Sequence, residues 1–436
     1  MNSLLSVFPE TAKVNSKGHL EIGGYDVSEL AAEYGTPLYI LDEQHLRNSC
    51  RRFKAEFASR YEATSVLYAA KAFLNRALAK LLQEEGIGLD VVSGGELEVA
   101  RLAGFPMDMV YVHGNNKSPE ELEAALSSHV GRIVADGYDE LELLASLARK
   151  TGHIPDILLR LTTGVDPHTH AYINTSKMDS KFGFPLFNAE RAVVMALESP
   201  SLNLVGFHCH IGSLINEVSP YEEALELVLD FAADMVEKHG LELEELDLGG
   251  GFGIRYLASD EEPPSAADFA QAITSRLASK CHEVRLPLPS LTIEPGRAIT
   301  GPAGVALYSV GAVKEIPGVR HYVSVDGGMG DNIRPALYQA EYQAVAARRM
   351  TEKESQKVTI AGRFCESGDI LVKEADLPRL SRGDLIALAS CGAYCIPMAS
   401  NYNLVPRPAI VMVKDGEARL VRRRESIEDL TRCDLD

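Results

Sequence analysis

The sequence predicts an α/β protein with two domains, a (β/α)8 barrel of the TIM type and a second, β-rich domain. Eight short apolar, β-branched runs recur along the chain, with amphipathic helical patterns between them. This alternation favours a parallel sheet, and eight units over roughly 230 residues fit a closed barrel. After about residue 300 the pattern changes to strands separated by turns. A doubly wound open sheet remains the alternative for the first part.

The eight predicted strands all end next to polar or glycine-rich residues. They are residues 66–70, 88–92, 109–113, 131–135, 157–161, 204–208, 246–250 and 291–295. The helical patterns between them carry ordinary end signals. Gly86, Gly104 and Gly240 stand where helices would stop, and Ser118 followed by Pro119 marks a helix start.

The β-rich domain is expected to be a sandwich or barrel-like sheet that uses both ends of the chain. Strand-like runs such as 304–316 and 409–416 follow one another with turns between them. Near the N-terminus, the segment 37–42, "PLYILD", has the same character and is expected to add a strand. We therefore predict the barrel at 38–299 and the β-rich domain at 1–37 and 300–436.

Composition excludes several classes of partner. The chain of 436 residues has 62 acidic and 43 basic side chains, and this acidic balance disfavours nucleic-acid binding, which needs a basic surface. Seven cysteines without a C-x-x-C pair argue against a disulfide framework and favour a reducing cytoplasm. The N-terminus lacks the regions of a signal peptide, and the apolar stretch 298–313 is too short for a bilayer. We expect neither nucleic acid nor a membrane as partner.

The residues that follow the predicted strands form a chemically distinctive set. In a barrel of this type the carboxyl ends of all strands face the active site, so these residues would meet there. The set comprises Lys71, Ser93, His113, His208, His210, Ser213, the glycines of 249–253, Glu294 and Arg297. The sequence therefore predicts an active site at this end of the barrel.

The last two strand ends indicate a phosphate site. Barrels often bind phosphate with the loops after strands 7 and 8, and "GGGFG" lets backbone N–H groups approach an anion there. Gly296 and Arg297 add a backbone donor and a cation. A tight turn is the alternative for the glycine run by itself.

A phosphate site together with a lysine at a strand end suggests pyridoxal phosphate. Its aldehyde needs a lysine amine, here Lys71, to form a Schiff base. Glu294 would face the pyridine nitrogen and keep it protonated, and His210 would stack on the ring. A solvated or ion-paired side chain is the alternative for Lys71 taken alone.

A metal site is the competing hypothesis. "HCH" at 208–210 and "HTH" at 168–170 each place two imidazoles on one side of a strand, as metal-dependent amidohydrolases of barrel fold do. In those enzymes the pair follows the first strand, whereas here it follows the sixth. A metal would also leave the glycine run and Glu294 without a role, so we predict no metal.

Motifs along most of the chain resemble those of the fold-type III pyridoxal-phosphate decarboxylases. They are "YAAKA", "DVVSGGELEVA", "HTHAYINTSKMDSKFGF", "HCHIGS", "DLGGGFG" and "EPGR", followed by "DNIRPALYQA", "CESGD", "GAY" and "YNLVPRP". Within that family, the resemblance implies the branch that decarboxylates meso-2,6-diaminopimelate to L-lysine and CO2, the last step of lysine biosynthesis by that route.

The resemblance also implies a role for each matching residue. Catalytic roles fall to Lys71, which forms the Schiff base, to Cys365 as proton donor, and to His210 and Glu294. The cofactor would be bound by Lys71, His210, Ser213, Gly249, Gly250, Gly251, Glu294, Pro295, Gly296, Arg297 and Tyr394. The amino-acid substrate would contact Arg297, Arg334, Tyr338, Glu366 and Tyr394. Cys365 and Glu366 would reach the site of the partner subunit, so the active site would be complete only in a homodimer.

The choice of substrate follows from the charges at its far end. Diaminopimelate carries a second amino-acid head group there. Arg297 and Arg334 can hold its carboxylate through forked hydrogen bonds, and Glu366 can hold its ammonium. A decarboxylase for ornithine or arginine has no use for two arginines at this position.

Two alternatives stay open. One is a related decarboxylase of another amino acid or polyamine precursor. The other is a non-catalytic pyridoxal-phosphate carrier, which would need neither Cys365 nor Arg334. A racemase of the same fold usually has an arginine opposite the ring nitrogen, where this chain has Glu294.

Overall fold

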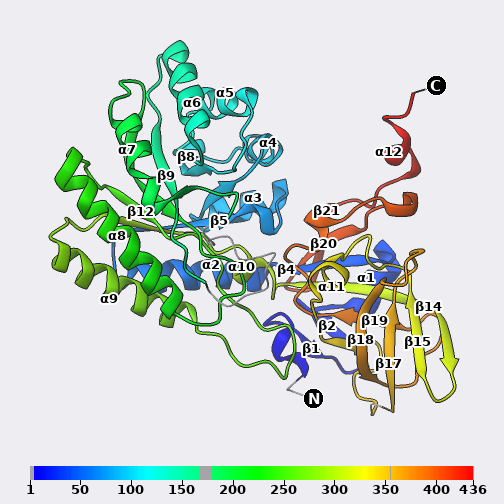
Figure 1. Cartoon of the computed structure of the whole chain (residues 1–436). Helices are drawn as coiled ribbons and strands as arrows, with labels where there is room; N and C mark the ends of the chain where they lie inside the picture. Colours follow the sequence, from blue (N-terminus) through cyan, green and yellow to red (C-terminus); the bar gives the residue numbers. More distant parts are fainter. Residues whose placement is uncertain (1–3, 167–178, 354, 436) are drawn as a thin grey trace. The chain divides into compact units, whose positions relative to one another are not determined.

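The computed structural model describes residues 4–166, 179–353 and 355–435, and the chain divides into two compact units (Figure 1). The barrel unit comprises Ser49–Gly253 and Pro263–Gly296. The other unit, called the β unit, comprises Met1–Asn48, Ile254–Glu262 and Arg297–Asp436.

Parallel strands close into a barrel in the first unit, so the predicted (β/α)8 fold is confirmed. The strands are β5 (Thr64–Ala69), β6 (Gly88–Val91), β7 (Val110–Val112), β8 (Arg132–Ala135), β9 (Asp156–Thr162), β11 (Asn203–Cys209), β12 (Glu245–Asp247) and β13 (Ser290–Ile293). They pair in that order, and β13 returns to β5 with Leu291 opposite Thr64. This return pairing excludes the open doubly wound sheet. The short β10 (Phe184–Pro185) also pairs with β9.

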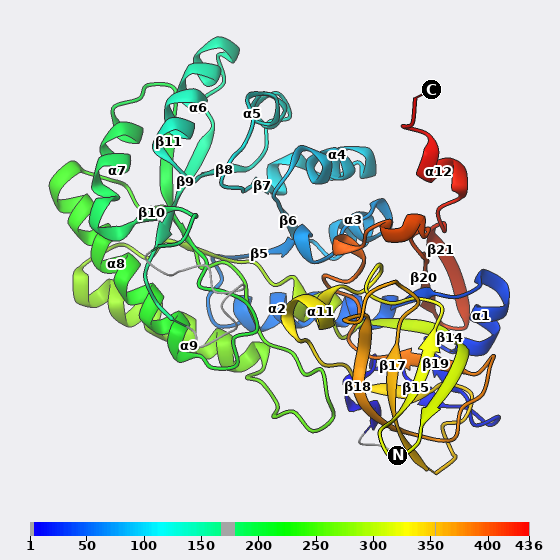
Figure 2. The same ribbon diagram turned by 45° about the vertical axis from the view of Figure 1, so that its right-hand side comes forward.

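Helices alternate with these strands, and the sequence accounts for their ends. They are α2 (Glu43–Ala58), α3 (Arg76–Glu84), α4 (Gly94–Ala103), α5 (Pro119–Ser127), α6 (Tyr138–Thr151), α7 (Glu190–Leu197), α8 (Ser219–His239) and α9 (Ala266–Val284). Side chains of Asn75, Ser93 and Ser118 accept from the first N–H groups of α3, α4 and α5. Gly240 ends α8 in a left-handed conformation that a Cβ disfavours. In Figure 2 the helices lie outside the strands of this unit.

The β unit contains a mixed sheet built from both ends of the chain. Its strands are β4 (Leu38–Asp42), β14 (Gly304–Ile316), β15 (Arg320–Val325), β16 (Ala344–Ala346), β17 (Gln356–Ala361), β18 (Ile370–Leu377), β19 (Leu385–Leu388), β20 (Ala409–Lys414) and β21 (Glu417–Arg422). The main path runs β18, β17, β15, β14, β4, β20, β21, and β19 joins β14 to β16. The N-terminal β4 therefore pairs with two strands from the C-terminal part, antiparallel to β14 and parallel to β20.

Short elements complete the β unit. They are the small sheet of β1 (Lys13–Val14), β2 (Leu20–Ile22) and β3 (Tyr25–Asp26), and the helices α1 (Val27–Tyr34), α10 (Arg297–Thr300), α11 (Arg334–Tyr338) and α12 (Ile427–Thr431). β4 and residues 254–262 fall in this unit, although the predicted barrel range 38–299 includes them. β4 belongs there because its backbone pairs with β14 and β20. The domain boundaries given in the sequence analysis, 38–299 for the barrel and 1–37 with 300–436 for the β-rich domain, stay a prediction.

The interior of the barrel is filled with apolar side chains. Leu67, Tyr111, Val134, Leu158 and Val205, from five different strands, form one buried cluster. One buried polar group lies at the start of β12, where Glu245 accepts hydrogen bonds from Tyr111 and Thr292. Among the described residues, no helix is long and apolar enough to cross a bilayer.

Candidate active site

Lys71 stands just beyond β5, in a turn of 3-10 helix over Ala70–Ala72. Its side chain is 34% exposed, and its Nζ lies 3.1 Å from Oδ2 of the fully buried Asp90 on β6. A carboxylate is buried at low cost only when it has a partner. The ion pair therefore holds the amine at this end of the barrel while part of the side chain stays accessible.

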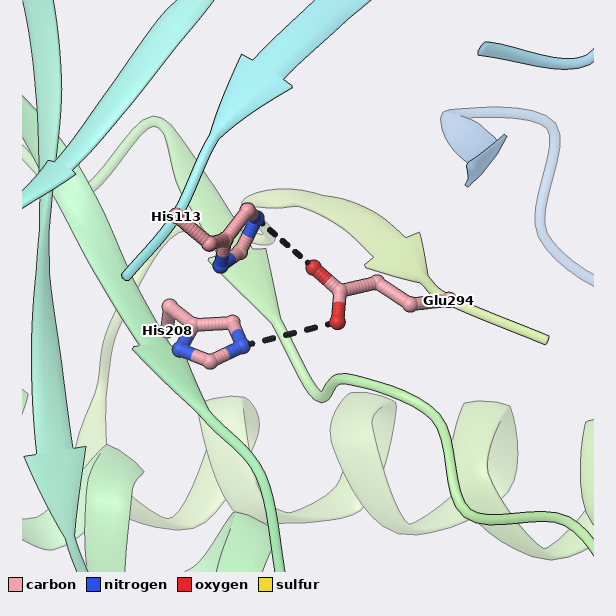
Figure 3. A group of neighbouring side chains, drawn as sticks. All are labelled: His113, His208 and Glu294. Carbon is pink, nitrogen blue, oxygen red and sulfur yellow. Dashed lines mark ion pairs between the residues drawn. The ribbon is translucent and has the colours of Figure 1, made fainter. Parts of the chain in front are cut away.

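Glu294 lies between two histidines at the same end of the barrel (Figure 3). Its Oε1 is 3.0 Å from Nε2 of His113, and its Oε2 is 3.7 Å from Nε2 of His208. The three side chains lie at the ends of β13, β7 and β11 and are at most 5% exposed. We call His113, His208 and Glu294 the histidine–glutamate cluster.

Neighbouring groups decide which buried acid of this region is ionised. Burial alone would raise the pKa of Glu294, but His113 and His208 outweigh it and hold that pKa well below its usual range. Burial and the charge of Glu294 raise the pKa of Asp247, on β12, well above its usual range. Two nearby carboxyl groups thus differ in state, with Glu294 as the anion and Asp247 as the protonated acid.

His210, just beyond β11, is a neutral ring with a defined tautomer. Its Nδ1 accepts a hydrogen bond from the N–H of Gly250 at 3.1 Å, so its own proton is on Nε2. Burial and the charge of Lys71 lower the pKa of His210 well below its usual value. A neutral imidazole held in this way can lie flat against an aromatic ligand.

The glycine run 249–251 is packed too tightly for any other residue type. A Cβ on Gly250 would lie 2.1 Å from the backbone oxygen of Glu294, and one on Gly251 would lie 2.3 Å from that of Gly212. Such separations are far shorter than any van der Waals contact. The run is therefore glycine because neighbouring backbone occupies the space of the side chains.

Two further loops lie against other parts of this barrel end. In the loop after β11, which contains Ser213, the N–H of Ile215 donates to the oxygen of Gly251 at 2.9 Å. In the loop after β13, a Cβ on Gly296 would lie 2.9 Å from the Cβ of Ala69, at the end of β5. Both loops thus bring their backbone close to neighbouring segments at this end of the barrel.

A second group of predicted site residues surrounds two buried arginines of the β unit. Nη1 of Arg297 donates to the hydroxyl of Tyr256 at 2.6 Å, and its guanidinium lies 4.5 Å from the ring centre of Tyr394. Arg334, at the start of α11, donates to the hydroxyl of Tyr342 and lies 4.9 Å from the ring centre of Tyr256. Tyr256 therefore contacts both arginines and holds them in one cluster.

The loop after β17 presents a thiol and a carboxylate at the surface of the β unit. Cys365 and Glu366 are both exposed. The hydroxyl of Tyr402 donates to Oε1 of Glu366 at 2.5 Å, and the N–H of Cys365 donates to Oδ1 of Asn403 at 3.4 Å. The side chain of Glu366 and the backbone of Cys365 are thus held by residues 402 and 403, and both residues are exposed in the single chain.

Residues 43–301 match the family model described as "Pyridoxal-dependent decarboxylase, pyridoxal binding domain". The chain belongs to the pyridoxal-dependent decarboxylases. This confirms the family expected from the motifs, and with it the expectation of an enzyme.

Relatives of this decarboxylase extend over nearly its whole length. It is 48% identical to the diaminopimelate decarboxylase of Bacillus subtilis (strain 168), over 98% of this chain and 97% of the relative. It is 43% identical to that of Synechocystis sp. (strain PCC 6803), over 98% and 93%. The crystal structure of diaminopimelate decarboxylase from M. jannaschii in complex with L-lysine has a TM-score of 0.92 at 36% identity and covers 98% of both chains.

The positions of the predicted site residues in this decarboxylase fall into two sets. Lys71, His210, Ser213, Gly249, Gly250, Gly251, Glu294, Pro295 and Gly296 lie in the barrel unit, and Arg297, Arg334, Tyr338, Cys365, Glu366 and Tyr394 lie in the β unit. The "HTH" segment 168–170 lies outside the described residues.

Sequence reasoning missed four buried residues of these groups. They are Asp90, Asp247, Tyr256 and Tyr342. An acid inside the apolar run "GLDVV" is a usable signal for Asp90, because strand interiors seldom contain one. The two tyrosines carry no such signal, since aromatic residues are ordinary core residues.

Glu96 gives this region a measurable pH dependence. Its carboxylate accepts from the N–H of Val92 at 2.8 Å, and burial, aided by the charge of Asp90, raises its pKa from 4.5 to about 7. The folded state therefore binds more protons than the unfolded state between these values, and the contribution of Glu96 to stability falls as pH rises through them. We expect the free energy of unfolding of Glu96→Gln, relative to that of the unsubstituted protein, to increase by roughly 1–3 kcal/mol as the pH rises from 4.5 to 8.

Urea unfolding at the two pH values measures this difference. The exposed Glu123 on α5 provides the control, because Glu123→Gln should show the same offset at both pH values. An offset for Glu96→Gln that is independent of pH contradicts the assignment.

Proposed function

We propose that this decarboxylase converts meso-2,6-diaminopimelate to L-lysine and CO2 with pyridoxal phosphate as its cofactor. One observation carries the proposal: a chain of contacts at one barrel end joins an amine to an ionised carboxylate. It runs from Lys71 through Asp90 and His113, whose Nε2 is 3.7 Å from Oδ1 of Asp90, to Glu294. The full-length relatives are diaminopimelate decarboxylases, which supports the same substrate.

The residues at this end of the barrel fit the cofactor. Lys71 offers an amine for the aldehyde, and Glu294 offers an anion for the ring nitrogen. Gly250 and Gly251 have no side chains, and a Cβ there would clash with backbone, so the main chain of this run would be open to close approach by the phosphate. The N–H of Gly250 itself donates to His210. Ser213, Gly249, Pro295, Gly296, Arg297 and Tyr394 complete the proposed cofactor contacts.

Each proposed catalytic residue has a defined task in the reaction. When bound, pyridoxal phosphate withdraws electrons from the carbon that loses CO2. Lys71 would hold the cofactor through its aldehyde, with Asp90 steadying the amine. Glu294 would hold a proton at the ring nitrogen, and neutral His210 would stack on the ring. Cys365 donates a proton to the carbon that has lost CO2.

The arginine cluster of the β unit supplies the proposed substrate specificity. Arg334 is 2% exposed, and among the described residues it has no carboxylate within ion-pair distance. A buried cation without an anion is costly, so it suits a ligand that brings a carboxylate. We propose that Arg334 and Arg297 bind the far carboxylate of the substrate, with Tyr338 and Tyr394 beside it and Glu366 on its ammonium.

The proposed assembly is a homodimer in the cytoplasm. Cys365 and Glu366 of one protomer would complete the site of its partner, which accounts for a thiol and a carboxylate exposed on one loop. The absence of any disulfide among the seven cysteines agrees with a reducing compartment.

An assay with purified protein tests the function directly. Release of CO2 and formation of lysine are measured with pyridoxal phosphate and meso-diaminopimelate, and the same amounts of ornithine and arginine serve as competing substrates. We expect turnover of diaminopimelate and little of the other two. Turnover of ornithine or arginine alone would indicate the related decarboxylase, and cofactor binding without any turnover would indicate the carrier.

Substitution of Arg334 tests the basis of specificity. We expect Arg334→Met to lower kcat/KM for meso-diaminopimelate by roughly 100- to 1,000-fold, mainly through KM, because a charge-assisted forked contact is lost. The kcat/KM of Arg334→Lys should lie between those of the unsubstituted protein and Arg334→Met, since lysine keeps the positive charge but cannot form the forked pair of hydrogen bonds. Cofactor affinity should not change. Arg382→Met, at an exposed arginine of the same unit, is the control; an equal loss of cofactor affinity in Arg334→Met would contradict a substrate role.

A further inference from the structure

The histidine–glutamate cluster contains two histidines to which neither the motifs nor the proposed reaction assigns a task. His113 and His208 extend from β7 and β11, and Glu294 extends from β13 (Figure 3). Each carboxylate oxygen faces the Nε2 of a different imidazole, at 3.0 Å and 3.7 Å. The two rings meet edge to face, with centres 4.8 Å apart. Each ring therefore limits the movement of the other as well as that of the carboxylate.

A carboxylate buried in this place needs such neighbours to remain an anion. Glu294 is 1% exposed, and Asp247 lies close enough to affect it. Burial and a nearby acid both favour the protonated form of a carboxyl group. Arg160, a cation whose charge interacts with that of Glu294, faces Asp136 at 3.8 Å and stacks on Phe182. The two imidazoles lie directly against the carboxylate, one facing each oxygen.

We infer that His113 and His208 are positioning residues, which aim the Glu294 carboxylate at the ring nitrogen of pyridoxal phosphate and keep it ionised for that contact. The inference rests on the proposed function. Each carboxylate oxygen has two lone pairs, so contact with the imidazoles leaves room for a ring N–H. Oδ1 of Asp90 lies 3.7 Å from Nε2 of His113, and its Oδ2 accepts from Nζ of Lys71.

An analogue of the cofactor separates this role from a general structural one. In 1-deaza-pyridoxal phosphate a C–H group replaces the ring nitrogen, so the analogue keeps the aldehyde and the phosphate but gives Glu294 nothing to bind. Dissociation constants for both compounds are measured by equilibrium dialysis with absorbance detection. We expect His113→Leu and His208→Leu to raise the dissociation constant of pyridoxal phosphate by roughly 10- to 100-fold. The dissociation constant of the deaza analogue should rise by less than about 2-fold.

Two further sets of variants distinguish loss of the proposed contact from general misfolding. Glutamine retains an N–H donor at similar size, so His113→Gln and His208→Gln should recover much of the affinity for pyridoxal phosphate. In a Glu294→Gln background, the leucine substitutions should have no additional effect, because the group through which the histidines act is gone. The exposed His282→Leu on α9 is the matched control and should change neither constant.

Each other outcome overturns the inference. An equal loss of affinity for both compounds would show that the histidines have a structural role only. Unchanged affinity for pyridoxal phosphate would show that they have no role in binding it. The three donor atoms lie within 4.8 Å of one another, so they could instead hold a metal ion. One equivalent of tightly bound zinc in the purified protein, lost in His113→Leu, would establish that alternative. Failure of the unsubstituted protein to bind pyridoxal phosphate would overturn the proposed function as well.

Discussion

Lys71→Arg is expected to lower turnover of meso-diaminopimelate by at least about 10⁴-fold, because the amine that binds the cofactor aldehyde is the nucleophile of the proposed reaction. Arginine keeps the positive charge that pairs with the buried Asp90 but has no amine that can lose its proton. The absorbance band near roughly 420 nm, typical of pyridoxal phosphate bound through lysine, should disappear as well.

Arginine is preferred to alanine for this test for an energetic reason. Lys71→Ala would leave Asp90 buried without its cation. Removing one partner of a buried ion pair costs roughly 3–5 kcal/mol of stability, a loss large enough to threaten the fold of the barrel. The exposed Lys80 on α3 gives the control, and Lys80→Arg should retain both turnover and the band. Persistence of the band in Lys71→Arg would mean that another amine binds the cofactor.

Cys365→Ala is expected to slow product formation by about 10²- to 10⁴-fold, the range in which a positioned general acid contributes. Cofactor affinity should stay the same, because the thiol delivers a proton and takes no part in holding the ring. The side chain is exposed, so its removal opens no cavity. Cys433→Ala, at the other exposed cysteine, is the matched control and should leave turnover unchanged.

A mixture of two inactive variants tests where Cys365 acts. If it serves the partner's site, a dimer of one Lys71→Arg and one Cys365→Ala protomer contains one intact site. Random pairing makes half of all dimers mixed, so dissociation and reassociation should restore about a quarter of the unsubstituted activity. If each site uses its own Cys365, the mixture stays inactive, and the proposed sharing between protomers is wrong.

The barrel strands could be predicted well, whereas the roles of the acidic residues within them could not. Each strand is a short apolar run followed by a polar or glycine residue, and this local pattern survives folding because both faces of a barrel strand are buried. Asp90 and Asp247 belong to such runs, and composition alone gives no sign of whether they pair, protonate or bind a ligand. Their states depend on Lys71 and Glu294, which lie in other strands or turns.

The histidines also show what could not be predicted from the sequence alone. The pattern "HCH" suggested that His208 and His210 act together. In the folded chain His208 joins His113 and Glu294, while His210 accepts a bond from Gly250. Side chains two residues apart share a face of a strand only while the strand continues, and β11 ends at Cys209, between the two histidines.

The sequence by itself determined the order of the barrel strands, the glycine run and the chemical types at the strand ends, because these depend on local patterns of side-chain size and polarity. Only the tertiary structure decided that the sheet closes, that Glu294 is held between two imidazoles, and that Tyr256 contacts both Arg297 and Arg334. These contacts join residues far apart in the chain. The free energy of such a contact depends on burial and on every neighbouring charge, and both exist only after the chain has folded.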